Sequence, residues 1–302
     1  MRRIISHTYF LAIIACLLWS TAFAGIKIGL EYTTPLQFAG IRFFLAGVFI
    51  LPLTKKLSLV WDAIKKYPLK ILRISVFQTI ILYSLFYWGV SKVPGAIAAI
   101  IIGSQPLFAA LVAHFMQKND SLSFKKLITI SMGILGIVLI AYHKAWGSTG
   151  NIDQFWGIII LIFANISSGI GNVFVSRLKG VVSPVVLSSW QMGFGGFVIF
   201  IFSLFIEPFN GFIHPLPYFL SLGWLSFLSA TAFTIWFFLL QRPEVLVSDL
   251  NIWKFIIPIF GAILSWLIIP GEKPELIPIL GMLIIGTSLI FYGLINRKKQ
   301  KS

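Results

Sequence analysis

The sequence has 302 residues, of which 58% are hydrophobic and 11% are charged, and its formal net charge is +15 at pH 7. This composition is far more apolar than that of a soluble domain and indicates an integral membrane protein. The apolar runs are about 20 residues long and do not alternate with period two, which favours membrane helices over a β-barrel. The basic residues cluster between these runs, where they set orientation, so the charge does not indicate nucleic-acid binding. The single cysteine, Cys16, excludes an intramolecular disulfide.

Ten apolar runs are long enough to cross a bilayer. They are predicted at 8–27, 35–54, 70–91, 95–117, 124–142, 155–176, 184–206, 217–240, 245–269 and 275–295. The first run follows Arg2 and Arg3 and has the features of a signal peptide, but it is longer than the core of such a peptide. We therefore expect an all-α integral membrane protein that keeps this segment as its first span.

An even number of spans places both termini on one side of the membrane. Of the 24 lysines and arginines, four lie in connections on the opposite side (Lys27, Lys92, Lys144 and Lys273), and Arg42 and Lys254 lie inside spans. The other 18 lie on the side of the termini. Basic residues concentrate in cytoplasmic connections, so we expect both termini in the cytoplasm and the protein in the plasma (inner) membrane.

Two connections have a distinctive composition. Residues 57–67 mix leucine, valine, tryptophan and isoleucine with Lys65 and Lys66, a pattern that fits a short helix on the inner membrane surface and equally a basic loop. Residues 207–217 contain three prolines, an asparagine and a glycine, which predicts a turn at the outer side.

Lys254 is the most unusual residue of the ninth run. At 1.5 Å per helical residue it lies roughly 14 Å from Val245, about half of a hydrocarbon core of about 30 Å. A lysine at this depth costs roughly 2.5 to 3.5 kcal/mol and by default indicates a functional site. We expect its ammonium to meet a substrate carboxylate or phosphate, together with Asn251 on the same helix face. The alternative is an ion pair with Asp249, but five residues separate the two by about 140° around a helix.

The two halves of the sequence show an internal repeat. Residues 1–147 and 148–302 each hold five predicted spans, and the matched positions are Pro35 with Pro184, Arg42 with Gln191, Pro106 with Pro258, and Asp120 with Glu272. An odd number of spans per half makes the second half enter the membrane from the opposite side, an inverted duplication typical of secondary transporters. Pro106 and Pro258 are the expected gating positions.

Five motifs of the apolar runs are Leu18-Trp19-Ser20-Thr21-Ala22-Phe23, Arg42-Phe43, Gln105-Pro106-Leu107-Phe108-Ala109-Ala110-Leu111, Pro258-Ile259-Phe260-Gly261-Ala262 and Gly271-Glu272. They are similar to those of EamA-type exporters in the drug/metabolite transporter superfamily. The resemblance covers essentially all ten spans. It implies an outward-directed carrier of amino acids or related small metabolites, with a central cavity lined by both halves. The chain departs from the family pattern at Ser20, at Lys118-Asn119-Asp120 and at the charges Asp249 and Lys254.

Polar residues at helical spacing mark other candidates for the walls of this cavity. Asn165, Ser168, Gly169 and Asn172 form one stripe on the sixth span. Thr79, Tyr83 and Tyr87 form another on the third, and Trp19, Ser20 and Thr21 lie together on the first. Such groups can bind an amphipathic solute, and equally they can hydrogen-bond between helices. Arg42 is a candidate for the substrate site, for a gate or for helix packing, and Asp249 is a candidate proton carrier.

These observations predict a secondary transporter that exports small metabolites, amino acids first, by alternating access. A nucleotide-like or lipid-like amphipath is an alternative substrate, and a non-transporting receptor or scaffold is an alternative function. No catalytic or phosphate-binding motif is present in the sequence, so we expect neither an enzyme nor a cofactor or metal. The expected partners are a small-molecule substrate and the lipid bilayer, and the oligomeric state is left open.

Overall fold

The structure is a computed structural model that describes residues 2–54, 56–117, 123–146 and 151–299. Within these ranges the chain is all-helical, with ten helical stretches long and apolar enough to span a membrane. They match the ten predicted runs closely, from Thr8–Leu30 to Leu276–Ile295. Asp120, the predicted counterpart of Glu272, lies outside the described residues.

Four of the ten spans are interrupted within their length. The first consists of α1 (Arg2–Ser20) and α2 (Ala22–Leu30), and the third of α5 (Pro68–Ser75), the π-helix η2 (Val76–Ile80) and α6 (Ile81–Lys92). The fourth consists of α7 (Gly95–Gly103) and α8 (Gln105–Met116). The ninth consists of α13 (Val247–Asn251), the 3-10 helix η3 (Ile252–Phe255) and α14 (Ile256–Ile268).

The remaining spans are more regular. They are α3 (Pro35–Ile50) with the 3-10 turn η1 (Leu51–Thr54), α9 (Phe124–Trp146), α10 (Ile152–Ser176), α11 (Pro184–Ile206), α12 (Leu216–Leu240) and α15 (Leu276–Lys299). Between the second and third spans the chain forms α4 (Leu57–Lys66). Of the two possibilities left open for residues 57–67, the short helix is therefore the correct one.

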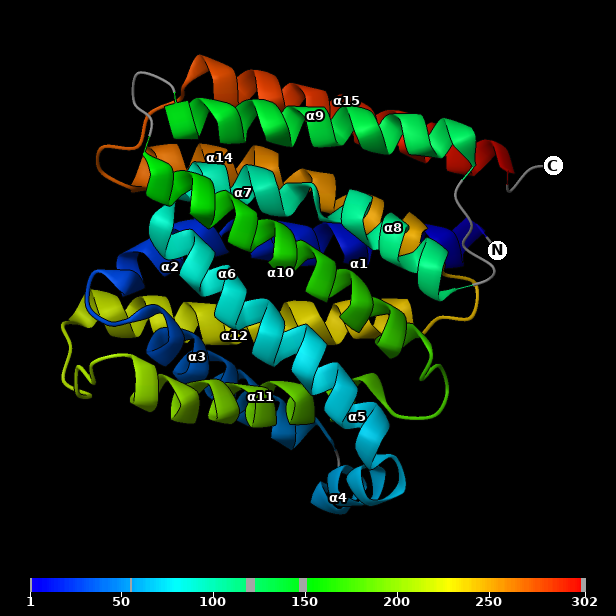
Figure 1. The fold of residues 1–302 in the computed structure, drawn as a ribbon. Helices are drawn as coiled ribbons and strands as arrows, with labels where there is room; N and C mark the ends of the chain where they lie inside the picture. Colours follow the sequence, from blue (N-terminus) through cyan, green and yellow to red (C-terminus); the bar gives the residue numbers. More distant parts are fainter. Residues whose placement is uncertain (1, 55, 118–122, 147–150, 300–302) are drawn as a thin grey trace.

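The two five-helix repeats are interleaved, because helices of the first repeat pack against those at corresponding places of the second. The packed pairs are α3 with α11, α7 with α14, and α9 with α15 (Figure 1). The first span of each repeat packs instead on the third span of the other repeat, α1 on α12 and α10 on α6. The connections at 31–34, 207–215 and 269–275 share one end, called here the outer end after the predicted orientation, and both termini lie at the inner end (Figure 1).

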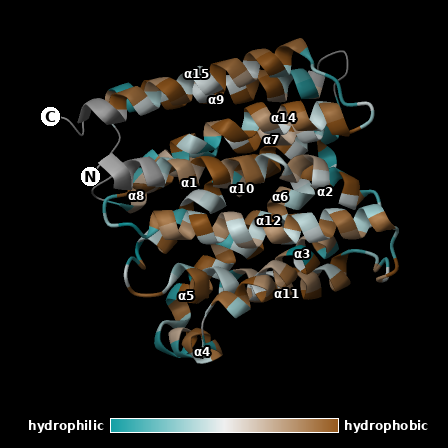
Figure 2. Cartoon of the chain, turned by 180° about the vertical axis from the view of Figure 1, so that it is seen from behind, coloured by the Kyte–Doolittle hydropathy of each residue, from teal (hydrophilic) through white to brown (hydrophobic). Residues whose placement is uncertain are grey.

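Packing between the repeats depends on glycine where backbones approach each other. A Cβ atom on Gly47 of α3 would lie 2.3 Å from the backbone nitrogen of Gly193 on α11, so no larger residue fits there. The lipid-facing surface is apolar instead. Phe205 and Leu267 are 81% and 77% exposed, and hydrophobic residues run along the outward helix faces while hydrophilic ones gather mainly at the two ends (Figure 2). This distribution suits a bundle surrounded by hydrocarbon.

Candidate functional site

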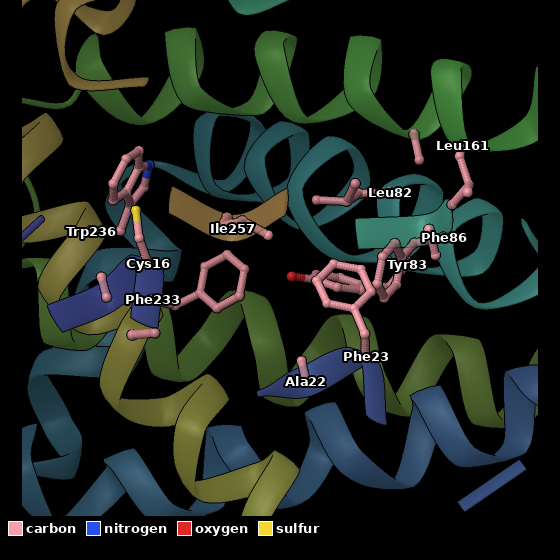
Figure 3. Packing of buried hydrophobic residues seen from close by; sticks show 14 of the residues in the cluster. Cys16, Ala22, Phe23, Leu82, Tyr83, Phe86, Leu161, Phe233, Trp236 and Ile257 are labelled. Atoms are coloured by element: carbon pink, nitrogen blue, oxygen red, sulfur yellow. The ribbon is translucent and has the colours of Figure 1, made fainter. Parts of the chain in front are cut away.

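A small cavity lies among the broken helices. The space open to the centre of a water-sized sphere is ≈ 60 Å³, enough for a few waters at roughly 10–15 Å³ each. Its lining residues are Trp19, Ala22, Phe23, Arg42, Gln78, Leu82, Tyr83, Phe86, Ile102, Gln105, Ser168, Phe233, Lys254 and Ile257. Figure 3 shows the rings of Phe23, Tyr83 and Phe233 near one another in this region, with Ile257 close by. Both repeats therefore contribute to the cavity.

Two prolines explain where the fourth and ninth spans are interrupted. Proline has no amide hydrogen, so it cannot bond to the carbonyl four residues earlier, and its ring disturbs that turn. For Pro106 this carbonyl belongs to Ile102, and for Pro258 it belongs to Lys254. The chain accordingly leaves α-helical geometry at Ser104, between α7 and α8, and over η3, which contains Lys254. The predicted gating prolines thus shape the turns that line the cavity.

Lys254 extends from η3 into an aromatic and amide environment. It is 4% exposed, and its ammonium donates a hydrogen bond to Oε1 of Gln105 at the beginning of α8. Its Nζ atom also lies 5.2 Å from the ring centroid of Trp19 and 4.6 Å from that of Trp236. Tryptophan faces stabilise a desolvated cation by about 2 kcal/mol each, which compensates in part for burial. None of these three neighbours carries a negative charge.

The contact between Lys254 and Gln105 has an apolar counterpart in the repeat. With Pro106 set against Pro258, Lys254 corresponds to Ile102 and Gln105 corresponds to Ile257. All four residues line the cavity. The lining therefore holds one polar pair and one pair of apolar counterparts, so the two repeats do not contribute the same chemistry to the cavity.

Arg42 is the second cation of the cavity wall, and it is held more tightly. Its Nε atom donates to the carbonyl of Leu225 (3.2 Å) and to Oγ of Ser229 (3.0 Å), and Nη1 donates to the hydroxyl of Tyr87 (2.6 Å). The guanidinium also lies 4.8 Å from the ring centroid of Phe43. Among the cavity-lining residues that the structure describes, none is acidic, so two cations face the cavity without a carboxylate.

A chain of side-chain amides runs beside the cavity. Gln78 Nε2 donates to Asn172 Oδ1, and Asn172 Nδ2 donates to Asn251 Oδ1, both at 3.2 Å. Asn251 Nδ2 then donates to the carbonyl of Val247 (2.8 Å). The chain links the third, sixth and ninth spans. Of its three amides, only Gln78 lines the cavity.

The structure separates the predicted site residues into two groups. Lys254, Trp19, Tyr83, Arg42 and, from the polar stripe of the sixth span, Ser168 line the cavity. The others contact neighbouring helices: Thr21 accepts a hydrogen bond from Nε1 of Trp224, Tyr87 accepts from Arg42, Asn165 donates to the carbonyl of Ile101, and Asn172 and Asn251 belong to the amide chain. Asp249 lies on α13 and is not a lining residue.

Sequence reasoning missed several lining residues. Gln105 was only part of a family motif, and Gln78, Phe86 and Phe233 carried no pattern of their own. The feature of the sequence that could have indicated Gln105 is the neighbouring Pro106. A residue next to a helix break at mid-membrane depth faces a cavity or protein, because a broken backbone is not tolerated against lipid.

Comparison with known proteins identifies the class. The sequence profile of the EamA-like transporter family matches residues 7–142 and 155–294, once for each repeat. The chain belongs to this family and is a membrane transporter. This confirms the resemblance that the motifs indicated. The members of the family are transporters and not enzymes.

Named relatives agree on transport. The chain is 23% identical to the uncharacterized transporter YoaV of Bacillus subtilis over 89% of this chain and 90% of that protein. It is 27% identical to the uncharacterized inner membrane transporter YedA of Escherichia coli over 75% and 72%. It is 26% identical to an S-adenosylmethionine/S-adenosylhomocysteine transporter of Chlamydia trachomatis over 94% and 88%. A solved crystal structure shares the fold with a TM-score of 0.70 at 17% identity, covering 96% of this chain and 99% of that chain.

Proposed function

We propose that the protein exports small metabolites that carry a carboxylate, amino acids first among them. The observation that carries this proposal is the pair of cations, Lys254 and Arg42, on a cavity whose described lining has no acidic residue. An anion is the complement of such a wall, and a buried charge interacts strongly where water is scarce. The aromatic rings of Trp19, Tyr83 and Phe233 would cover the apolar part of the solute.

The two cations would play different parts. The guanidinium of Arg42 is already engaged by three acceptors, so it would act mainly through its field. The ammonium of Lys254 is held by one neutral amide and two rings, and a carboxylate would replace Gln105 Oε1 as the stronger acceptor. The cavity is smaller than an amino acid, so the substrate would enter by movement of the repeats about the broken helices. Both termini would face the cytoplasm.

The test is transport into liposomes with substrates that differ in one group. Three labelled solutes would be compared: an amino acid, its decarboxylated amine and the matching 2-oxo acid. We expect the two carboxylated solutes to move and the amine to be excluded. Lys254→Met should reduce carboxylate transport at least tenfold while the melting temperature holds, and Lys125→Met, at the exposed inner end of α9, is the matched control.

One outcome would overturn the proposal: transport of the amine at the rate of the amino acid. Undiminished flux in Lys254→Met would remove Lys254 from the site. S-adenosylmethionine belongs in the same panel, because a relative is named as its transporter. Preference for this solute over simple amino acids would support the nucleotide-like alternative. The absence of flux for every solute in the panel would place the substrate outside these chemical classes.

A further inference from the structure

The helix α4 stands at the edge of the bundle, at the inner end below α5 (Figure 1). Only Val60 of this helix is buried, and its contacts are with α11, α5 and η1. Leu57 and Trp61, one helical turn apart, are 61% and 58% exposed. The helix thus packs one apolar edge on the protein and leaves a second apolar edge largely exposed, although the ring centroid of Trp61 lies 6.1 Å from that of Trp190 on α11.

Basic residues come directly after this apolar edge in the sequence. Lys65 lies one turn after Trp61, and Lys66, Lys70 and Arg73 come next along the chain. The Nζ atoms of Lys66 and Lys70 lie 5.5 Å and 5.3 Å from the centroid of the same ring, that of Tyr67. Two ammonium groups are therefore held around one phenol ring, at the elbow between α4 and α5. Asp62 is the single acid in the sequence from 51 to 75.

We propose that this elbow binds the phosphate of anionic phospholipids in the cytoplasmic leaflet. Two cations beside one ring make a local excess of positive charge, and a phosphate at the elbow would offset it. Leu57 and Trp61 would insert at the level of the acyl–headgroup boundary, where indole rings are favoured. The apolar edge and the basic elbow are adjacent, which matches a lipid that presents chains and phosphate together. A soluble phosphate would use only the elbow.

The experiment places a probe on α4 and offers it two lipids. In a Cys16→Ser background, Leu57→Cys would carry an environment-sensitive nitrobenzoxadiazole label, since Cys16 is the single native cysteine. The protein would be reconstituted in phosphatidylcholine vesicles with about 30% phosphatidylglycerol. Quenching by spin-labelled phosphatidylglycerol would be compared with quenching by spin-labelled phosphatidylcholine. We expect a blue-shifted label and preferential quenching by the anionic lipid.

Charge variants assign the preference to the elbow. Lys66→Gln with Lys70→Gln should reduce the preference about fivefold for each lysine removed, and salt at about 1 M should largely abolish it. Lys125→Gln with Lys273→Gln removes the same charge from other exposed positions and should leave the preference intact. Equal quenching by both lipids, a water-exposed label, or an unchanged preference in the Lys66 and Lys70 variant would overturn the proposal. Displacement of the lipid by added inorganic phosphate would instead assign the elbow to a free anion.

Discussion

Lys254 and Gln105 are separated by 149 residues in the chain, yet the ammonium of one donates to the side-chain oxygen of the other across the cavity wall. Gln105 belongs to the fourth span and Lys254 to the ninth, each close to a proline that interrupts the helix. Their counterparts, Ile102 and Ile257, are both apolar. A neutral amide can yield the ammonium to a substrate carboxylate, which a fixed counter-ion would not do. This distinction leads to the first prediction.

Gln105→Glu should abolish transport of carboxylated substrates. The new carboxylate would pair with Lys254 at the same place as the present amide oxygen, and a pair in a dry site is strong. The substrate would then meet an occupied cation and a like charge, so we expect the transport rate to fall at least tenfold. Initial rates in liposomes would measure this, and unfolding of the purified variant would show whether the fold is intact.

Gln105→Met is the informative comparison for that variant. It removes the acceptor without adding charge, so Lys254 keeps only its two aromatic neighbours. We expect carboxylate binding to be retained or tightened, with a loss of about 1 to 3 kcal/mol in stability because a buried donor is left unpaired. Equal loss of transport in both variants would indicate that Gln105 shapes the helix break and does not compete with substrate.

Arg42→Lys should destabilise the protein although the charge is kept. A lysine cannot reach Tyr87, Ser229 and the Leu225 carbonyl at once, because it lacks the planar fork of donors. We expect a loss of about 2 to 4 kcal/mol in the free energy of unfolding, against about 1 kcal/mol for Tyr87→Phe, which removes one bond. Denaturant unfolding in detergent would compare the two. A larger effect of Tyr87→Phe would contradict this account.

Much of the architecture could be predicted from the sequence because the bilayer restricts it so strongly. Twenty-residue apolar runs have few folded outcomes in hydrocarbon, and all ten predicted spans are present with ends that differ by a few residues. Lys254 could also be singled out, since its cost at mid-depth does not depend on knowing its partners.

The rest of the site depends on which faces meet, and periodicity alone does not provide this. Asn165 and Asn172 belong to the predicted polar stripe and Asn251 to the predicted face of Lys254, but they bond to other helices instead of lining the cavity. Ser168 of the same stripe does line it. Gln78 reaches the cavity from the π-helix η2, whose extra residue per turn shifts the register of the third span. Phe233 is apolar on an apolar helix, so only tertiary packing shows that it faces the cavity.

Glu272 and Glu207 cap the outer ends of two helices across the repeats. Glu272 accepts from the backbone nitrogens of Gly95 (2.6 Å) and Ala96 (3.1 Å) at the start of α7. Glu207 accepts from those of Leu36 (3.0 Å) and Gln37 (3.1 Å) at the start of α3. Each replacement by glutamine should cost about 1 to 2 kcal/mol, because it removes a charge from a helix N-terminus.

The two capping variants should differ in transport. α7 ends at the break beside Gln105, where a change of backbone direction is available to it, whereas α3 is an unbroken helix in close backbone contact with α11 at Gly47. We therefore expect Glu272→Gln to change the transport rate severalfold and Glu207→Gln to leave it near the parental value. Parallel unfolding curves separate the stability effect from the transport effect. A rate that follows stability alone in both variants would argue against a pivot at α7.

Glu275 should make stability depend on pH at the outer end. Its carboxylate accepts from Lys144 Nζ at 2.6 Å and 2.8 Å, and it lies 3.2 Å from His143 Nε2. Burial alone raises the pKa of Glu275, but the bonds and charges of Lys144 and His143 outweigh it, so the pKa lies below its ordinary value of 4.5. A carboxyl whose pKa is lowered by folding stabilises the protein above its unfolded pKa, and that stability is lost as the pH falls through the folded value.

Glu275→Gln should therefore melt at a lower temperature than the parent at pH 7, where it also leaves the buried Lys144 ammonium without its counter-ion. The difference should shrink as the pH is lowered below 4.5. Glu31→Gln, at the end of α2 on the same side of the bundle, is the control, and its melting temperature should follow the parent throughout. A difference for Glu275→Gln that persists unchanged into acid would show that the contact acts through shape and not through charge.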